Sequence, residues 1–455
     1  MLFDFLKYVQ PTWYFNLTPA KGKAVYWVDY HKLPPEEKRL IDFDENFSTS
    51  DAPQLDAAYQ ALHKGIIKDD AQFVFEAPVR TCFDIADNYR FIKKYYRAFW
   101  TYYIFCRRIL SFHNPIKEIQ ALQQVKHVRK VNLHDRVKRY DQYENFASPL
   151  LAEVPFISVI VPTLNRYPYL KDVFVDLARQ DYTHFEVIVI DQTDEPDRAF
   201  YDQLKLQKTV VFQEGKGQWL SRNEAVRIAG GDFLLFYDDD SRVEPDWITQ
   251  HIKGLDFFGA DITAGVSFSK TGGEIPKDYS YFRWASQFDS GNALVKREVF
   301  ESIGLFDRQF DKMRMGDGEF GLRAYLFGFK SISHPYASRL HLKVDSGGLR
   351  QMGSWDAFRS ANLFAPKPIP SVLYLYRKYF PASNVKNALI LGVFPSLIPY
   401  KFKRNKVLYP VGILMAIVML PVLSIQVFKS WKRAGAMLQE GDKIEVLKQR
   451  NLTQR

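Results

Sequence analysis

The sequence is poor in cysteine, with Cys82 and Cys106 as its two cysteines among 455 residues. This content excludes a disulfide-stabilised scaffold and is typical of a protein from a reducing compartment. Cysteine and histidine do not cluster with the spacing of zinc ligands, so we expect no structural zinc site. The N-terminal run MLFDFLKYVQ is broken by Asp4 and Lys7 and has no basic stretch before it, so we expect no signal peptide.

Acidic residues are scarce near the C-terminus. Residues 401–455 hold 11 Lys or Arg against 3 Asp or Glu, which accounts for most of the net charge of +10. A nucleic-acid-binding protein is expected to carry such an excess on its folded body, so we do not expect nucleic acid as a partner.

One long apolar run, from Val407 to Phe428, carries no charge. It exceeds the roughly 20 residues that a bilayer-spanning helix needs. Basic residues on both sides also suit a helix that lies in an anionic leaflet. We therefore expect residues 401–435 to span the membrane or to lie in its interface, and a soluble core helix is the alternative.

Residues 1–150 form an N-terminal accessory region, which we expect to be mixed α/β or rich in helix. Its most distinctive stretch runs from Asn88 to Phe112 and is aromatic and basic at roughly helical spacing. Such a stretch indicates an amphipathic helix packed on the body of the protein, or one that lies in a membrane interface. The sequence assigns no role to the region.

From Phe156 the pattern changes to short runs rich in β-branched residues: FISVIVPTLN, FEVIVIDQTD, TVVFQEGKG and DFLLFYDDD. Segments with helical spacing separate them. This alternation predicts an α/β fold with a doubly wound, mostly parallel sheet. Each run ends in polar or glycine residues, and in such sheets ligands bind beyond the carboxyl ends of the strands. We expect these ends to gather along one edge.

The last of these runs ends in three consecutive aspartates, Asp238, Asp239 and Asp240. Their repulsion requires a counter-charge, and a hard divalent cation such as Mg²⁺ or Mn²⁺ would supply one. Strand alternation places Asp238 and Asp240 on one side and Asp239 on the other. The alternative is a solvated acidic turn.

The motifs from Phe156 to Arg350 resemble, in order, those of the family 2 glycosyltransferases. That family consists of inverting enzymes of the GT-A fold that use nucleotide sugars. ISVIVPTLNR is similar to its first strand and nucleotide loop, and VIVIDQTDEPD to its second strand. EGKGQWLSRNEAVRIAGGDFLLFYDDD is similar to its glycine turn, Arg-Asn pair, helix and D-x-D signature. In the second block Gln192 and Thr193 replace the usual acid and glycine.

The resemblance implies a set of donor-binding residues: Pro162, Thr163, Asn165, Arg166, Asp191, Gly217, Arg222, Asn223 and Asp238. It implies a Mn²⁺ or Mg²⁺ cofactor held by Asp238, Asp240 and His341, with His334 as the alternative to His341. The donor is expected to be a UDP-, GDP- or dTDP-sugar.

The segment MRMGDGEFGLRAYLF aligns with the catalytic block of the family. The resemblance makes Asp317 the general base, and Gly316 stands where the family has Glu. The alternative role for Asp317 is a helix N-cap. Gly291, Asn292 and Glu319 are the expected acceptor-side residues. QMGSW, at residues 351–355, departs from the Q-x-x-R-W signature of processive synthases, which favours single additions.

The chain is therefore expected to divide into the accessory region 1–150, a GT-A catalytic domain 155–350, a helical region 351–400, the membrane segment 401–435 and a polar tail 436–455. The expected function is transfer of a sugar to a glycan or lipid-linked acceptor in cell-surface polysaccharide synthesis, with the catalytic domain in the cytoplasm. A catalytically degenerate scaffold and a sugar-phosphate nucleotidyltransferase are the alternatives. The second lacks its glycine-rich basic loop here, because VPTLNRYPYL follows the first strand.

Overall fold

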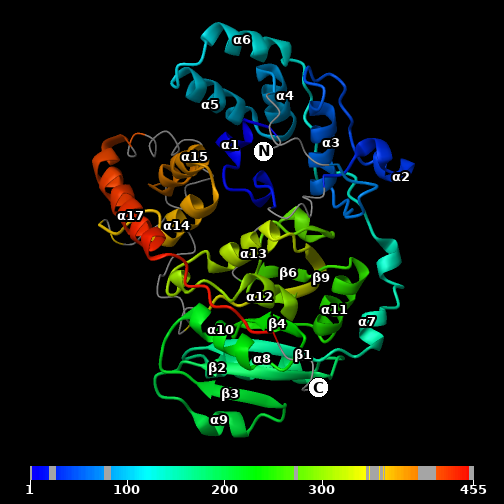
Figure 1. Ribbon diagram of the computed structural model, residues 1–455, viewed down its shortest axis with the longest axis vertical. Coiled ribbons are helices and arrows are strands. Elements are labelled where there is room, and N and C mark those ends of the chain that lie inside the picture. Colours follow the sequence, from blue (N-terminus) through cyan, green and yellow to red (C-terminus); the bar gives the residue numbers. More distant parts are fainter. Residues whose placement is uncertain are drawn as a thin grey trace. The chain divides into compact units, whose positions relative to one another are not determined.

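The computed structural model describes residues 3–19, 27–75, 83–270, 275–344, 364–397 and 417–449, with the single residues 348, 358, 362 and 414. Its elements are labelled in Figure 1. The chain divides into two compact units. Unit 1 comprises Met1–Tyr140, Tyr281–Trp284 and Tyr379–Gly392, and unit 2 comprises Asp141–Ser280, Ala285–Lys378 and Val393–Arg455. The N-terminal unit thus incorporates two later segments of the chain.

Unit 1 is mostly helical in its described part. It contains α1 (Leu6–Val9), α2 (Pro35–Lys38), α3 (Ala52–His63), α4 (Ile85–Tyr95), α5 (Ala98–Ile109), α6 (Pro115–Gln124), β7 (Arg283–Trp284) and most of α15 (Ala382–Val393). The Phe3 ring stacks on Phe91 of α4 at 4.2 Å. A buried ion pair joins α3 to α4, since Lys94 Nζ lies 2.5 Å from Asp56 Oδ2. Aromatic packing and this pair hold the helices together.

The aromatic and basic stretch from Asn88 to Phe112 forms two helices. α4 ends at Tyr95, and Tyr96 takes an extended conformation before α5 begins at Ala98. The Tyr96 hydroxyl donates to Gln10 at 2.9 Å, which fixes the break against the N-terminal segment. Pro115 opens α6, and the Asn114 side chain accepts from the backbone N–H of Ile116 and Lys117.

Unit 2 is built on a mixed sheet. Its strands are β1 (Ile157–Thr163), β2 (Phe185–Asp191), β3 (Lys208–Phe212), β4 (Phe233–Tyr237), β5 (Ser241–Val243), β6 (Ile262–Ser269), β8 (Asn292–Lys296) and β9 (Ser331–His341). They follow the order β3-β2-β1-β4-β8-β6-β9-β5. The pairs among β1 to β4 and the β6–β9 pair are parallel, whereas β8 is antiparallel to both its neighbours.

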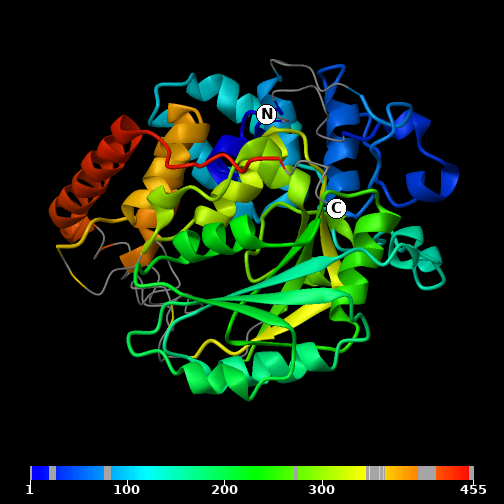
Figure 2. The same cartoon turned by 60° about the horizontal axis from the view of Figure 1, so that its bottom comes forward.

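Helices of unit 2 cover both faces of this sheet (Figure 2). The helices from the first part of the unit are α7 (Pro149–Ala152), α8 (Tyr167–Ala178), α9 (Arg198–Asp202), α10 (Gln218–Ile228), α11 (Trp247–Phe257), α12 (Arg297–Ile303) and α13 (Gly316–Leu326). α14 (Pro370–Tyr379) and α17 (Leu420–Glu440) lie together to one side of the sheet (Figure 1). The predicted α/β sheet is confirmed, with more antiparallel pairing in its second half than the sequence indicated.

The predicted gathering of the strand ends is also confirmed. Every residue of β1 is buried, and its last residue, Thr163, pairs in register with Asp191, the last residue of β2. β4 runs parallel to β1 on its other side and leads into Asp238. Fully buried strands with neighbours on both sides hold these ends at one edge of the sheet, here called the carboxyl rim.

The predicted membrane segment, residues 401–435, lies partly outside the described residues. Its second half enters α17, which continues through Lys429, Lys432 and Arg433. Among the described residues, no helix combines the length and the apolarity needed to cross a bilayer.

Asn292, an expected acceptor-side residue, instead braces the core of unit 2. Its side-chain oxygen accepts from Trp247 at 2.8 Å and lies 3.1 Å from His251 Nε2, and its amide donates to the carbonyls of Val266 and Ala337 at 3.0 Å each. The side chain is 0% exposed. All its hydrogen-bonding capacity therefore serves the packing of α11, β6 and β9.

The buried His251 makes the stability of the protein sensitive to acid. Burial lowers the pKa of His251 to about 4, opposed by its hydrogen bond to Asn292. Since an unfolded histidine titrates near 6.5, the unfolded chain takes up the proton first as the pH falls. The free energy of unfolding then drops between pH 6.5 and 4, by up to about 1.4 kcal/mol per pH unit for this one group.

We predict that His251→Gln lowers the slope of the free energy of unfolding against pH by the contribution of one proton. Urea unfolding at pH 7, 6 and 5 measures this slope. His63 and His334 are also buried with lowered pKa values, so part of the slope should persist. His31→Gln, the same substitution at an exposed position, is the matched control. Equal slopes in native protein and His251→Gln would contradict the prediction.

Candidate active site

The site is assembled where β4 ends at the carboxyl rim. Asp238, Asp239 and Asp240 form the turn from β4 into the short β5, and the Tyr237 hydroxyl donates to the Ser241 carbonyl at 3.0 Å across it. β5 pairs antiparallel with the end of β9, placing Ser241 opposite His341. This pairing brings a histidine from 100 positions along the chain to the aspartates.

Asp238, Asp240 and His341 form a candidate metal centre. Their potential ligand atoms lie within 4.8 Å of one another, and His341 Nε2 is 3.3 Å from Asp240 Oδ1. Burial raises the pKa of Asp240, but the His341 hydrogen bond and the Arg166 charge lower it by more. The pKa of Asp240 therefore lies below its ordinary value. Two carboxylates and an imidazole fit a Mn²⁺ or Mg²⁺ ion.

Two arginines clamp Asp238. Arg222 Nη2 lies 2.7 Å from Asp238 Oδ1, and Arg339 Nη1 lies 2.7 Å from Oδ2. Arg339 is itself fixed, because its second Nη donates to both oxygens of Asp289 at 3.0 and 3.1 Å. A Cβ on Gly291 would stand 2.1 Å from Asp238 Oδ2, so a glycine is required for this close approach.

Asp239 points to the other side, as strand alternation predicted. Its carboxylate accepts from Arg166 at 2.8 Å and from the Thr163 hydroxyl at 2.9 Å. Burial raises the pKa of Asp239 to about 6, and Arg166 opposes that rise. Arg166 also lies 3.4 Å from Asp240. Thr163 and Arg166, both expected to bind donor, therefore hold the aspartate turn in this structure.

Asp191, at the end of β2, is 1% exposed. Its carboxylate accepts from the hydroxyls of Tyr167 at 2.7 Å and Tyr201 at 2.9 Å, and from the backbone N–H of Thr193 at 2.9 Å. Asn165 joins the same loops, because its backbone N–H donates to the Thr193 hydroxyl at 3.0 Å. Asp191 and Asn165 thus shape the loops beyond β1 and β2.

The start of α10 is occupied by an aspartate from a distant segment. Asp311 Oδ1 accepts from the backbone N–H of Trp219 at 2.8 Å and Leu220 at 3.2 Å. Gly217 precedes the helix, and a Cβ there would meet Asp311 at 2.7 Å. Its backbone N–H donates to Gln192 at 2.9 Å, so Gln192, a departure from the family pattern, ties this turn to β2.

Asp317 lies in the first turn of α13 and is half-buried. The helix begins at Gly316 after Met315, whose φ is +78°, so Asp317 is inside the helix and is not its N-cap. A Cβ on Gly316 would stand 2.3 Å from the Trp219 indole. The missing Glu therefore has a physical cause, because the Trp219 ring, buried in unit 2, occupies its place.

Part of the chain is similar in sequence to known proteins. Residues 158–314 match the family model described as Glycosyl transferase family 2. This part of the chain is a family 2 glycosyltransferase domain. Its relatives include the uncharacterized glycosyltransferase YwdF of Bacillus subtilis, 29% identical over 207 residues, which are 42% of this chain and 75% of YwdF.

A second relative and a solved structure also show similarity to this chain. The poly(ribitol-phosphate) beta-N-acetylglucosaminyltransferase TarS of Staphylococcus aureus is 31% identical over 112 residues, 23% of this chain and 20% of TarS. The mannosyltransferase PcManGT of Pyrobaculum calidifontis, solved with GDP-Man and Mn²⁺, aligns with 65% of this chain and 91% of its own at 17% identity and a TM-score of 0.41.

Further residues expected at the donor, acceptor or metal positions are buried in structural contacts. Asn223 bonds both backbone groups of Phe306 at 2.9 Å. Glu319 is 0% exposed and pairs with Arg323 at 2.9 Å. His334 Nε2 lies 2.9 Å from the Tyr143 hydroxyl, so His341 is the histidine beside the aspartates. With Asn292, these residues offer no surface to a substrate. Pro162 is likewise buried, inside β1.

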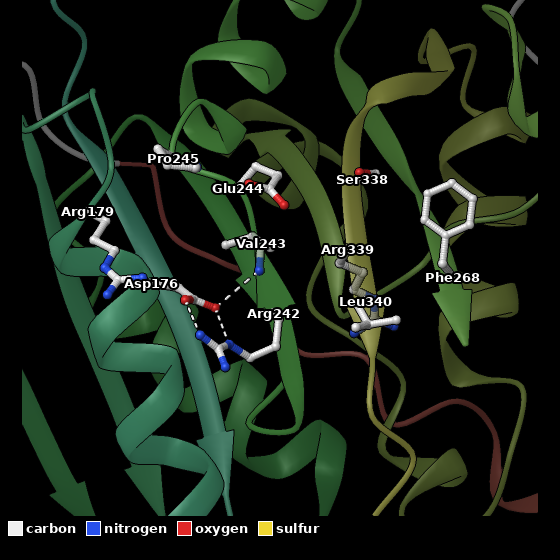
Figure 3. A pocket seen from close by; sticks show the side chains of 10 residues that line it. All are labelled: Asp176, Arg179, Arg242, Val243, Glu244, Pro245, Phe268, Ser338, Arg339 and Leu340. Carbon is white, nitrogen blue, oxygen red and sulfur yellow. Dashed lines mark hydrogen bonds and ion pairs between the residues drawn. The ribbon is translucent and has the colours of Figure 1, made fainter. Parts of the chain in front are cut away.

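A cavity of about 390 Å³ lies along the β5–β9 pair of strands. On one wall Arg242 faces Asp176 of α8 and donates to it twice at 2.7 Å, and Phe268 and Leu340 lie across the cavity (Figure 3). Arg339 lines it too, so the cavity adjoins the clamp on Asp238. Arg339 and Asp289 were missed in the sequence, because a resemblance to a family segment does not show which side chains pair in space.

We predict that Asp240→Asn and His341→Gln each lower Mn²⁺ affinity by about tenfold or more, because each removes a ligand. Mn²⁺ binding can be titrated by the loss of its free-ion EPR signal. Asp172 is a matched control, since it is half-exposed on α8 and outside the ligand group. An equal loss in Asp172→Asn would show that overall charge, and not this centre, binds the ion.

Proposed function

We propose that the protein is a metal-dependent, inverting glycosyltransferase. It transfers a sugar from a nucleotide sugar to a hydroxyl of a glycan or lipid-linked acceptor in cell-surface polysaccharide synthesis. The observation that supports this most is the group of Asp238, Asp240 and His341 at the carboxyl rim of a family 2 domain. Its acidic and imidazole ligands suit a cation that accompanies a nucleoside diphosphate.

Different residues of the chain have different roles in the reaction. Asp317 accepts the proton of the acceptor hydroxyl as the acceptor oxygen forms a bond to the anomeric carbon. The bond from that carbon to the diphosphate oxygen breaks in the same step, and the diphosphate leaves with the electron pair. A single displacement inverts the configuration. Asp238, Asp240 and His341 would hold the cation, which would supply positive charge beside the leaving diphosphate.

The Arg166, Arg222 and Arg339 guanidiniums keep the aspartate turn in one geometry before substrate enters. Preorganised groups contribute more to catalysis than groups that must reorient during the reaction. The cell-surface role is supported by relatives such as TarS, a poly(ribitol-phosphate) beta-N-acetylglucosaminyltransferase. The apolar, basic residues 401–435 support action at the cytoplasmic face of a membrane.

We predict that Asp317→Asn lowers sugar-nucleotide turnover in the presence of Mn²⁺ by about 10²-fold or more, since a general base contributes that much or more. Donor binding, followed by thermal shift, should stay within about twofold of native, because the substitution keeps shape and removes the base. Asp202→Asn, at an exposed position of α9, is the matched control. Equal turnover in native protein and Asp317→Asn would reject Asp317 as the base.

We further predict that one class among UDP-, GDP- and dTDP-sugars stabilises the protein in a thermal-shift screen, and only with Mn²⁺ or Mg²⁺ present. A ligand at 100 times its dissociation constant adds about 2.7 kcal/mol to the free energy of unfolding. Donor binding without any turnover would instead favour a degenerate scaffold. Equal stabilisation with and without the cation would contradict the metal-dependent mechanism.

A further inference from the structure

In unit 1, α5 and α6 form a helical hairpin (Figure 1). The hairpin exposes an unusual set of apolar side chains. Along α5 the exposed positions recur at helical spacing, and they continue through the connecting loop onto α6. We call this set the hairpin surface. Its members are Phe99, Tyr102, Leu110, Phe112, Ile116 and Ile119, with side chains between 47% and 98% exposed.

The opposite faces of the same helices are anchored, so the outward orientation is fixed. Thr101 and Ile104 of α5, and Glu118 and Ala121 of α6, are buried. Glu118 accepts from Arg108 of α5 and from the buried Tyr89 of α4, at 2.7 Å each. The two helices are thus locked to each other and to α4 through their inner faces.

Phe112 shows that this exposure is not a packing accident. It is 98% exposed and has a φ of +60°, a left-handed conformation that follows α5. Glycine is the favoured residue at such a position after a helix, and a bulky side chain raises the energy of the backbone. The phenylalanine therefore costs stability twice, through conformation and exposure, without packing against unit 1.

The charge around the hairpin surface has one sign. Between residues 97 and 130 the sequence carries seven Lys or Arg and one acid. The acid is Glu118, which is buried and paired with Arg108. Lys117, Lys126, Arg129 and Lys130 are exposed. The hairpin and the loop after it therefore present apolar side chains together with exposed basic ones, and residues 97–130 have no exposed carboxylate.

We propose that the α5–α6 hairpin is a docking surface for an anionic lipid bilayer. Phe99, Leu110, Phe112 and Ile116 enter the boundary between headgroups and acyl chains, while the lysines and arginines contact lipid phosphates. Tyr102 suits the interface, where an apolar ring with a polar end is favoured. A second copy of the chain fits less well, because two such basic surfaces repel each other.

This inference is independent of turnover and of residues 401–435. The hairpin lies wholly within unit 1 and needs no donor, metal or acceptor. If the proposed function is correct, the surface holds the enzyme next to a lipid-linked acceptor. Residues 401–435 would be a second attachment, and two attachments that are each weak by themselves give stable binding at a membrane.

The test is co-sedimentation of the full chain with vesicles of 30% phosphatidylglycerol in phosphatidylcholine, and with pure phosphatidylcholine. The triple variant Leu110→Ser, Phe112→Ser, Ile116→Ser should partition at least about tenfold less onto anionic vesicles. Lys117→Gln with Lys126→Gln should lose about fivefold per residue on anionic vesicles and little on neutral ones. Val446→Ser is the control, because Val446 is 80% exposed in unit 2.

A second readout uses Cys106, which is exposed on the same side of α5. In a Cys82→Ser protein labelled there with an environment-sensitive dye, anionic vesicles should shift the emission to the blue. Circular dichroism and a donor thermal shift establish that each variant is folded. Native-like partitioning of the folded triple variant would overturn the proposal. So would a native dimer that the triple variant converts to monomer, since that identifies a second copy as the occupant.

Discussion

The repulsion among Asp238, Asp239 and Asp240 is the constraint around which the catalytic unit is organised. Three carboxylates at the end of a buried strand would destabilise the fold unless opposite charge were supplied. The structure supplies it from the protein itself, through Arg166, Arg222 and Arg339. A cation is thus not needed to hold the turn together. It enters a site whose charge is already largely balanced by arginines from three separate elements.

This balance explains features that otherwise look unrelated. Gly291 is required because Asp238 and Arg339 meet where its side chain would be. Asp289 supplies the buried Arg339 with a second carboxylate besides Asp238. The β5–β9 pairing delivers Arg339 and His341 together, two residues apart on one strand. The same pair of strands therefore positions both Arg339, one of the two arginines that clamp Asp238, and His341, the third candidate metal ligand.

Local patterns predicted the strands, their burial and the orientation of Asp239, because alternation along a strand is a short-range property. They did not predict Arg339, since its role depends on a pairing between residues 100 positions apart. From the sequence alone, Gly316 indicated the loss of a catalytic partner. In the structure, the Trp219 ring occupies the space that a side chain at position 316 would need. Glu319 and Asn292 were predicted on the acceptor side but are buried in the core. A buried polar side chain and a substrate-binding one cannot be told apart in a sequence.

The central claim is that Asp238, Asp240 and His341 hold the cation that carries the donor diphosphate. The most direct measurement is the anomalous scattering of Mn²⁺ in crystals grown with a nucleoside diphosphate. The account predicts one strong peak within coordination distance of Asp240 and His341, with a diphosphate oxygen on its open side. A diphosphate bound at the carboxyl rim with no peak there, or a peak at other residues, would contradict it.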